Sequence, residues 1–188
     1  MIKPSHILKG VVAATWLAVF PTHAGAQEAD LRDEAQLLER LKEAEPGDAD
    51  WIEAQLRAVW AQSGSAAMDL LLKRGQDALE VEDFDAAIGH LTALTVHAPE
   101  FAEGWVARAT AYYLSDLFGP AVADLERALA LNPHHYEAII GLAIILEQVG
   151  YPKLAFDAYE QAASIHPHHE AVTNGLERLG PRVGGQDL

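Results

Sequence analysis

The chain has 188 residues, of which 28 are acidic and 13 are lysine or arginine, and its formal net charge is −15. This charge excludes nucleic acid as the expected partner, because phosphate binding requires clustered lysine and arginine. The sequence contains no cysteine, which excludes disulfides, a thiol nucleophile and the lipidated cysteine of a bacterial lipoprotein.

The first 26 residues have the composition of a secretory signal peptide. Lys3 and Lys9 give a positive start, an apolar run covers 11–20, and 24–26 reads Ala-Gly-Ala, a small-residue cleavage signal. The apolar run is too short for a comfortable bilayer span. We therefore expect export, cleavage after Ala26, no membrane span in the mature chain and, because cysteine is absent, a periplasmic location. An uncleaved membrane anchor is the alternative.

Residues 27–67 are expected to form a helical hairpin ahead of the rest of the fold. Apolar residues at helical spacing stand on both sides of the helix-breaking pair Pro46-Gly47. They are Leu31, Leu38 and Leu41 before the break, and Ile52, Leu56 and Val59 after it. We expect this hairpin to cover the open end of a helical stack. The alternative is a dimerisation element built on Trp51 and Trp60, because aromatic anchors are favoured at interfaces.

A repeat of 34 residues follows the hairpin. Pro99, Pro133 and Pro167 are spaced 34 apart, with alanine twelve positions before each and glycine or alanine twenty-four positions before each. Small residues at fixed positions let two helix backbones approach closely, and the proline ends the second helix. The pattern predicts helix pairs that stack in sequence order. The predicted units are 68–101, 102–135 and 136–169.

This pattern resembles the tetratricopeptide repeat family over residues 68–169, and the middle unit carries the fullest match. The matching residues of that unit are Trp105, Ala109, Tyr112, Phe118, Ala121, Leu125, Ala128 and Pro133. The sequence departs from the family at Leu94, where alanine is preferred, and at Arg74 and Arg108, where leucine is preferred. The resemblance implies an all-α fold, an α-α superhelix of the tetratricopeptide-type solenoid, and with the signal peptide we expect a member of the exported bacterial type.

Breaks within the repeats are also visible in the sequence. Asp83 is placed to cap the second helix of the first unit. Gly150 is suited to end a helix in the left-handed conformation, and Pro152 to open the next. After the last repeat, 170–180 is expected to be a capping helix that Gly180-Pro181 ends, followed by a disordered tail over 181–188.

The first helix of each pair lines a concave groove in this family, and the resemblance carries that role onto nine positions here. They are Leu72, Gln76 and Leu79 in the first unit, Val106, Thr110 and Tyr113 in the second, and Ile140, Ile144 and Glu147 in the third. This strip is mostly apolar, and contiguous exposed apolar surface is usually covered by a partner. The lysine, arginine and asparagine with which some family members hold a peptide C-terminus are missing.

Three acids, Asp69, Glu103 and Glu137, recur near the starts of the same helices and are expected to rim the groove with negative charge. We therefore expect the groove to bind a protein or peptide segment with apolar anchors and basic flanks, as an amphipathic helix or an extended strand. The alternative is that the groove is filled by the chain's own hairpin or closing helix.

The sequence contains no phosphate-cradling glycine loop, no nucleophile elbow and no HExxH motif. We therefore expect no enzymatic activity and no cofactor, and favour an interaction module, an adaptor of the cell envelope. One alternative is a divalent-metal site formed by histidines of the repeat-closing turns. These are His97, His134, His135, His166, His168 and His169. The other alternative is a structural protein that associates with itself.

Overall fold

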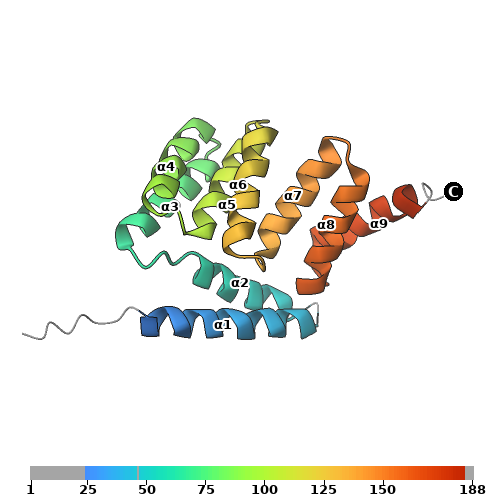
Figure 1. Cartoon of the computed structure of the whole chain (residues 1–188), viewed down its shortest axis with the longest axis horizontal. Coiled ribbons are helices and arrows are strands. Elements are labelled where there is room, and N and C mark those ends of the chain that lie inside the picture. The colour runs from blue at the N-terminus through green and yellow to red at the C-terminus, as the bar shows by residue number, and fades with distance from the viewer. Residues whose placement is uncertain (1–23, 46, 185–188) are drawn as a thin grey trace, which may run out of the picture.

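The computed structural model describes residues 24–45 and 47–184, with side chains from Asp33 onward. Within these residues there are nine helices and no strand (Figure 1). In chain order they are α1 (Ala24–Glu43), α2 (Ala49–Trp60), α3 (Ala66–Glu80), α4 (Phe84–His97), α5 (Ala102–Leu114), α6 (Phe118–Leu131), α7 (Tyr136–Gln148), α8 (Pro152–Ile165) and α9 (Glu170–Gly184). The predicted all-α superhelix is confirmed. Most of the predicted signal peptide and the last four residues lie outside the described part.

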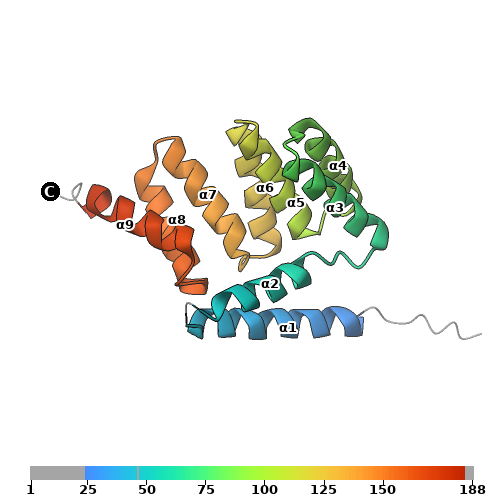
Figure 2. The ribbon, with the colours of Figure 1, turned by 180° about the vertical axis from the view of Figure 1, so that it is seen from behind.

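Helices α3 to α8 form three antiparallel pairs that lie side by side in sequence order (Figures 1 and 2). The 34-residue pattern follows from close approach between the helices of a pair. A Cβ added to Gly75 would lie 2.5 Å from the side chain of Leu91 on α4. The alanines that precede each proline by twelve positions, Ala87, Ala121 and Ala155, are completely buried. Small residues therefore stand where the axes come closest.

Two of the departures from the family pattern are explained by the contacts of the residue, which are packing for Leu94 and polar bonds for Arg108. Leu94 is completely buried, and it faces Gly104, whose added Cβ would lie 3.1 Å from Leu94. A large side chain on α4 is therefore matched by a missing one on α5. Arg108 donates from Nε and Nη2 to both carboxylate oxygens of the buried Asp124, at 2.7 and 2.8 Å, and from Nη1 to Thr95 at 2.8 Å.

The turn between the two helices of each pair contains one residue in the left-handed region. These residues are Glu82, Asp116 and Gly150, with φ of 60°, 59° and 90°, and they are related by the repeat period. The Asp83 side chain accepts a hydrogen bond from the N–H of Ala86, and Pro152 is the first residue of α8. The capping roles predicted for Asp83, Gly150 and Pro152 are confirmed.

The N-terminal hairpin lies along one edge of the stack, beneath the second and third pairs, where the repeat-closing turns are (Figures 1 and 2). The prediction that it covers the open end is therefore wrong. Apolar residues of α1 and α2, such as Leu41 and Leu56, share a buried cluster with Tyr136 of α7 and Tyr159 of α8. The apolar residues of the hairpin are therefore buried against the edge formed by α7 and α8.

The two tryptophans of the hairpin have different surroundings. Trp60 is 7% exposed and stacks on His135, with 4.1 Å between ring centroids. Trp51 is 57% exposed, with the guanidinium of Arg40 4.7 Å from its ring centroid. Since Trp60 is used within the chain, the proposed dimerisation element loses one of its two anchors.

Helix α9 packs on α8 and closes the far end of the stack. A Cβ added to Gly175 would lie 2.6 Å from the ring of Tyr159, so the glycine lets the two helices approach. The helix continues through Pro181 to Gly184, and the predicted end at Gly180-Pro181 is wrong. Leu179, two residues before the proline, is completely buried and anchors this part of α9 to the core. Pro181 itself lies on the exposed side of the last helical turn. None of the helices in 24–45 and 47–184 is long and apolar enough to cross a bilayer.

Candidate functional site

A cavity of about 320 Å³ lies between α5 and α7, the helices that the resemblance places on the concave side, and we call it the concave cavity. Five of the nine predicted groove residues line it: Val106, Thr110, Tyr113, Ile140 and Ile144. Glu137, which the sequence places at the rim of the groove, also lines it, and the sequence pattern did not identify the other lining residues, which are Ala109, Leu125, Gly141, Ile145 and His169. The walls are mainly aliphatic, and this matches the apolar strip expected from the sequence.

Helical spacing explains how the walls form. Val106, Thr110 and Tyr113 follow one another at four and three residues along α5, so they share one face. The hydroxyl of Thr110 is bonded to the carbonyl of Val106 at 3.1 Å, and this uses its donor within the helix. Tyr113 packs against Phe118, with ring centroids 5.9 Å apart. The missing side chain of Gly141 leaves space in the opposite wall.

The first repeat does not contribute to this cavity. Leu72 is 2% exposed and lies in one buried cluster with Ala107 and Ala111 of α5. Small residues at 107 and 111 let α3 pack directly onto α5, whereas the residue one repeat after Ala111 is Ile145, which lines the cavity. Leu79 packs against the same first-repeat cluster and Gln76 is exposed. Leu72 is therefore buried in the core and not a groove residue, while the groove roles of Gln76 and Leu79 stay predictions.

Glu147 also lies outside the cavity. Its two carboxylate oxygens accept hydrogen bonds from Nε and Nη2 of Arg178 on α9, both at 2.7 Å. These bonds lower the pKa of Glu147, against a smaller opposing effect of burial. Glu147 thus joins the closing helix to α7.

The three rim acids are already bonded within the chain. Asp69 accepts from the backbone N–H of Ser63 at 2.8 Å. Glu103 pairs with Nε2 of His135 at 3.0 Å, and Glu137 accepts from Nε of Arg57 on α2 at 2.7 Å. Of the three, Glu137 lines the concave cavity. The groove therefore carries less free negative charge than the sequence pattern indicates.

Two histidines of the repeat-closing turns, His135 and His166, contact the hairpin. His135 is completely buried, and His166, 1% exposed, pairs through Nε2 with Glu53 of α2 at 2.7 Å. His169 lines the concave cavity, where burial and then His166 lower its pKa. In the described part of the chain, no three His, Asp or Glu side chains gather as a metal site would require. The proposed metal site therefore has no geometric support there.

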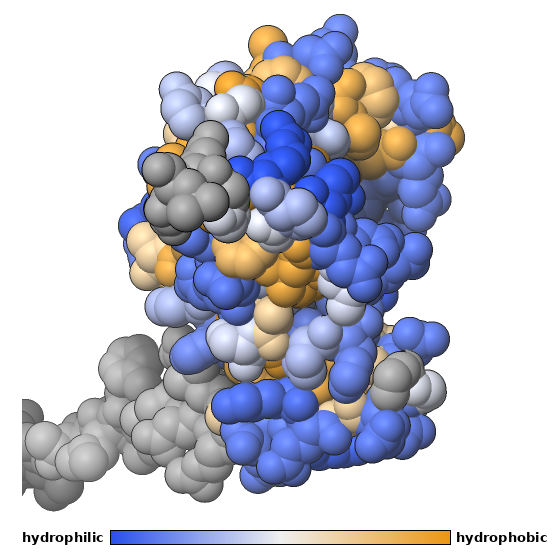
Figure 3. Space-filling model, turned by 90° about the vertical axis from the view of Figure 1, so that its right-hand side faces the viewer, coloured by the Kyte–Doolittle hydropathy of each residue, from blue (hydrophilic) through white to orange (hydrophobic). Residues whose placement is uncertain are grey.

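The surface around these sites is uneven in character. Seen from the α9 end, hydrophilic residues dominate the hairpin edge, and hydrophobic residues gather in separate patches above it (Figure 3). Tyr151 and Leu154, at the start of α8, are 58% and 53% exposed. The polar hairpin edge and the apolar concave cavity are therefore chemically distinct surfaces.

Comparison with known proteins gives relatives by sequence and by structure. The sequence is 30% identical over 151 residues to a TPR repeat-containing protein of Rhizobium etli, covering 80% of this chain and 74% of that protein. No protein-family model matches the chain.

Solved structures with the same fold cover about two thirds of the chain. The Sgt2 TPR domain of Aspergillus fumigatus has a TM-score of 0.61 and 24% identity, covering 65% of this chain and 83% of that domain. The first TPR of Spaghetti (RPAP3), bound to an HSP90 peptide, has a TM-score of 0.60 and 22% identity, covering 62% and 93%. The Yersinia enterocolitica secretion chaperone SycD, in complex with a YopD peptide, has a TM-score of 0.59 and 13% identity, covering 63% and 95%.

Proposed function

Because the chain belongs to the tetratricopeptide repeat family, we propose that it is a non-enzymatic interaction module that binds a segment of another protein. The observation that carries the proposal is the apolar cavity between α5 and α7, which is open on the concave side and lined by Tyr113 and Ile144. Apolar surface of this kind in water favours a covering partner. Two of the similar structures, Spaghetti and SycD, hold peptides.

The chemistry of the cavity defines the segment that fits it. Aliphatic walls favour apolar anchor side chains, presented by an amphipathic helix or an extended strand. Glu137 at the hairpin end of the cavity, together with the net charge of −15, favours basic residues flanking the anchors. Arg57 already bonds Glu137, so these flanks contribute less to affinity than the anchors.

The setting in which the module acts is also part of the proposal. The basic start, the short apolar run and the Ala-Gly-Ala signal support export to a bacterial periplasm. In that compartment the module would act as an adaptor or scaffold of an envelope assembly. Mass spectrometry of protein from an envelope fraction tests this step, and the expected mature chain begins at Gln27.

Cross-linking from inside the cavity tests the binding site. A photoreactive amino acid at Thr110, on the concave side, is expected to capture a defined partner in a native envelope preparation. The same amino acid at the exposed position Glu126 on α6 serves as the control. Capture from position 126 with none from position 110 would contradict the assignment.

Charge substitutions in the cavity separate binding from folding. Tyr113→Lys and Ile144→Lys put an ammonium group in an apolar cavity and are expected to abolish capture while leaving the helical circular dichroism intact. The matched control is Val96→Lys, because Val96 is an apolar residue of α4 with 67% exposure. Unchanged capture in both cavity variants would place the binding surface elsewhere.

A further inference from the structure

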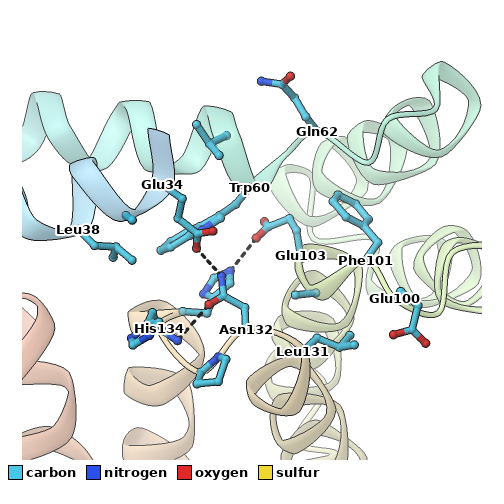
Figure 4. Close-up of a pocket in the computed structure, with 15 residues that line it drawn as sticks. Glu34, Leu38, Trp60, Gln62, Glu100, Phe101, Glu103, Leu131, Asn132 and His134 are labelled. Carbon is cyan, nitrogen blue, oxygen red and sulfur yellow. Dashed lines mark hydrogen bonds and ion pairs between the residues drawn. The ribbon is translucent and has the colours of Figure 1, made fainter. Parts of the chain in front are cut away.

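A second cavity, of about 490 Å³, lies where the hairpin meets the turns that precede α5 and α7 (Figure 4). One side is formed by α1 and α2, and the other by residues 100–103 and 131–135. It shares no lining residue with the concave cavity. The two are therefore separate sites, and the hairpin, which the repeat pattern does not include, is needed to form this one.

Its walls combine apolar and carboxylate groups. Trp60, Phe101, Leu38 and Val59 supply aromatic and aliphatic surface, and Ala102 and Leu131 add to it. Figure 4 shows the carboxylates of Glu34 from α1 and Glu103 from α5 pointing toward the same region beside Asn132.

Each of these two carboxylates is held by one of its oxygens. Oε1 of Glu34 accepts from Nε1 of Trp60 and from Nδ2 of Asn132, both at 2.7 Å. Oε2 of Glu103 pairs with Nε2 of His135 at 3.0 Å. Within the described part of the chain, the second oxygen of each has no hydrogen-bond partner, although an ionised carboxylate accepts about four hydrogen bonds. Both acids are therefore fixed in place with acceptor capacity remaining.

The cavity lacks a cation of its own. Its fifteen lining residues include three glutamates but no lysine or arginine. The third glutamate, Glu100, is 78% exposed and pairs with Arg127, outside the lining. Glu103 is 15% exposed, so it is largely removed from water without a permanently charged partner. His135 is completely buried, and its Nδ1 has no hydrogen-bond partner among the described residues.

We propose that this cavity binds an alkyl guanidinium or alkyl ammonium group, as carried by a basic side chain of a polypeptide or by a free diamine. The free oxygens of Glu34 and Glu103 accept charge-assisted hydrogen bonds from the cationic head. Trp60, Phe101 and Leu38 contact the alkyl stem, in the way that long basic side chains lie along apolar surface. The net charge of −15 favours the approach of such a cation.

The indole N–H of Trp60 provides a site-specific readout, because it donates to Glu34. We would titrate 15N-labelled protein with N-acetyl-arginine amide, with N-acetyl-citrulline amide as the uncharged control, and with cadaverine as the free diamine. A saturable shift of the Trp60 indole resonance by the arginine probe or by cadaverine, and none by citrulline, is expected. Saturation by the arginine probe assigns a polypeptide side chain, and saturation by cadaverine alone assigns a free diamine.

Two kinds of variant test the assignment to this cavity. Glu103→Gln and Glu34→Gln are each expected to weaken binding about tenfold or more, the effect of one charge-assisted hydrogen bond, while Glu126→Gln on the exposed face of α6 leaves it unchanged. Ala35→Trp fills the cavity from an exposed position of α1 and leaves both carboxylates and their partners in place.

Ala35→Trp is expected to abolish the shift, and its control is Ala123→Trp at an exposed position of α6. If a glutamine variant loosens the hairpin, Ala35→Trp still tests the proposal, because it fills the cavity without changing either carboxylate. Equal shifts with arginine and citrulline, or undiminished binding in Ala35→Trp, would overturn the proposal.

Discussion

The interfaces between the repeats and the junction with the N-terminal hairpin are built from different contacts. Between and within repeats, glycine or alanine meets a large side chain, as Gly75 meets Leu91 and, one repeat apart, Gly141 meets Leu125 and Gly175 meets Tyr159. At the junction, single polar pairs such as Glu53 with His166 cross large sequence separations. The apolar contacts recur with the 34-residue repeat, whereas each polar pair at the junction is a single contact that the repeat does not reproduce.

This difference separates two energetic roles. Periodic packing holds the stack together along its length, since each repeat contributes its own core and its neighbour's interface. The polar pairs of the junction orient the hairpin on the edge of the stack, and removing one partner of a pair leaves the other buried without a hydrogen bond. Substitutions in the two regions should therefore fail differently, the first by loss of the whole fold and the second by local release of the hairpin.

The largest expected effect comes from a polar pair inside the repeats, which is an exception to the apolar contacts that otherwise join them. Asp124→Ala leaves the 13% exposed guanidinium of Arg108 without its carboxylate. We expect a loss of about 3–5 kcal/mol in the free energy of unfolding, measured by urea denaturation. The control is Glu100→Ala, which removes an exposed ion pair with Arg127 and should cost less than about 1 kcal/mol.

A second substitution sharpens this prediction. Arg108→Leu restores the residue that the family prefers, so in the Asp124→Ala background it should recover much of the lost stability, because an apolar pair of similar volume often replaces a buried ion pair without cost. A loss of under about 1 kcal/mol in Asp124→Ala alone would mean that the pair is not a fixed part of the repeat core.

The next effect tests the periodic packing itself. Gly75→Ala puts a Cβ 2.5 Å from Leu91, and we expect a loss of about 1–3 kcal/mol in the free energy of unfolding from overpacking. Gly89→Ala on α4 is the matched control, because a Cβ there meets nothing within 4 Å. That variant should gain up to about 1 kcal/mol from helix propensity. Two changes of the same sign and size would show that close approach does not determine the glycine at 75.

The same contrast explains what could be predicted from the sequence. The helix pairs and their order follow from a pattern of small and large residues that is present in all three units. The left-handed turn at 150 follows from the glycine there. Five cavity residues follow from their position on α5 and α7. Among the described residues, neither the hairpin nor the closing helix lines the cavity between α5 and α7, although Arg57 of α2 bonds Glu137 and Arg178 of α9 bonds Glu147.

The failures have physical causes as well. The repeat position that Leu72 shares with Val106 predicts a place in the groove, yet alanines at 107 and 111 let α3 pack onto α5 and bury Leu72. The hairpin edge depends on pairs separated by 113 residues for Glu53 and His166, and by 80 for Arg57 and Glu137. No spacing rule relates such residues, so the second cavity was not visible in the sequence.

A smaller effect is expected at the junction. His166→Ala removes a buried hydrogen bond to Glu53, and we expect the free energy for local opening of α1 and α2 to fall by about 1–2 kcal/mol. Hydrogen exchange would detect this as faster exchange in the hairpin, with little change in α4 to α6. His168→Ala, an exposed histidine in the same turn, is the control. Uniform acceleration across all helices would mean that the hairpin and the stack unfold as one unit, and the contrast between the regions would fail.

The smallest effect concerns the turns opposite the hairpin edge, where all three repeats use a left-handed residue. Gly150→Ala should cost about 1 kcal/mol, because a Cβ at φ 90° strains the backbone while meeting no neighbour within 4 Å. Glu82→Gly should be favourable by a similar amount, and Asp116→Gly by less, since aspartate tolerates this conformation better than glutamate. Thermal unfolding of the three variants measures the order. Because the positions are equivalent by the repeat, a result in which Glu82→Gly destabilises as much as Gly150→Ala would mean that the first and third turns are under different constraints, despite their shared backbone geometry.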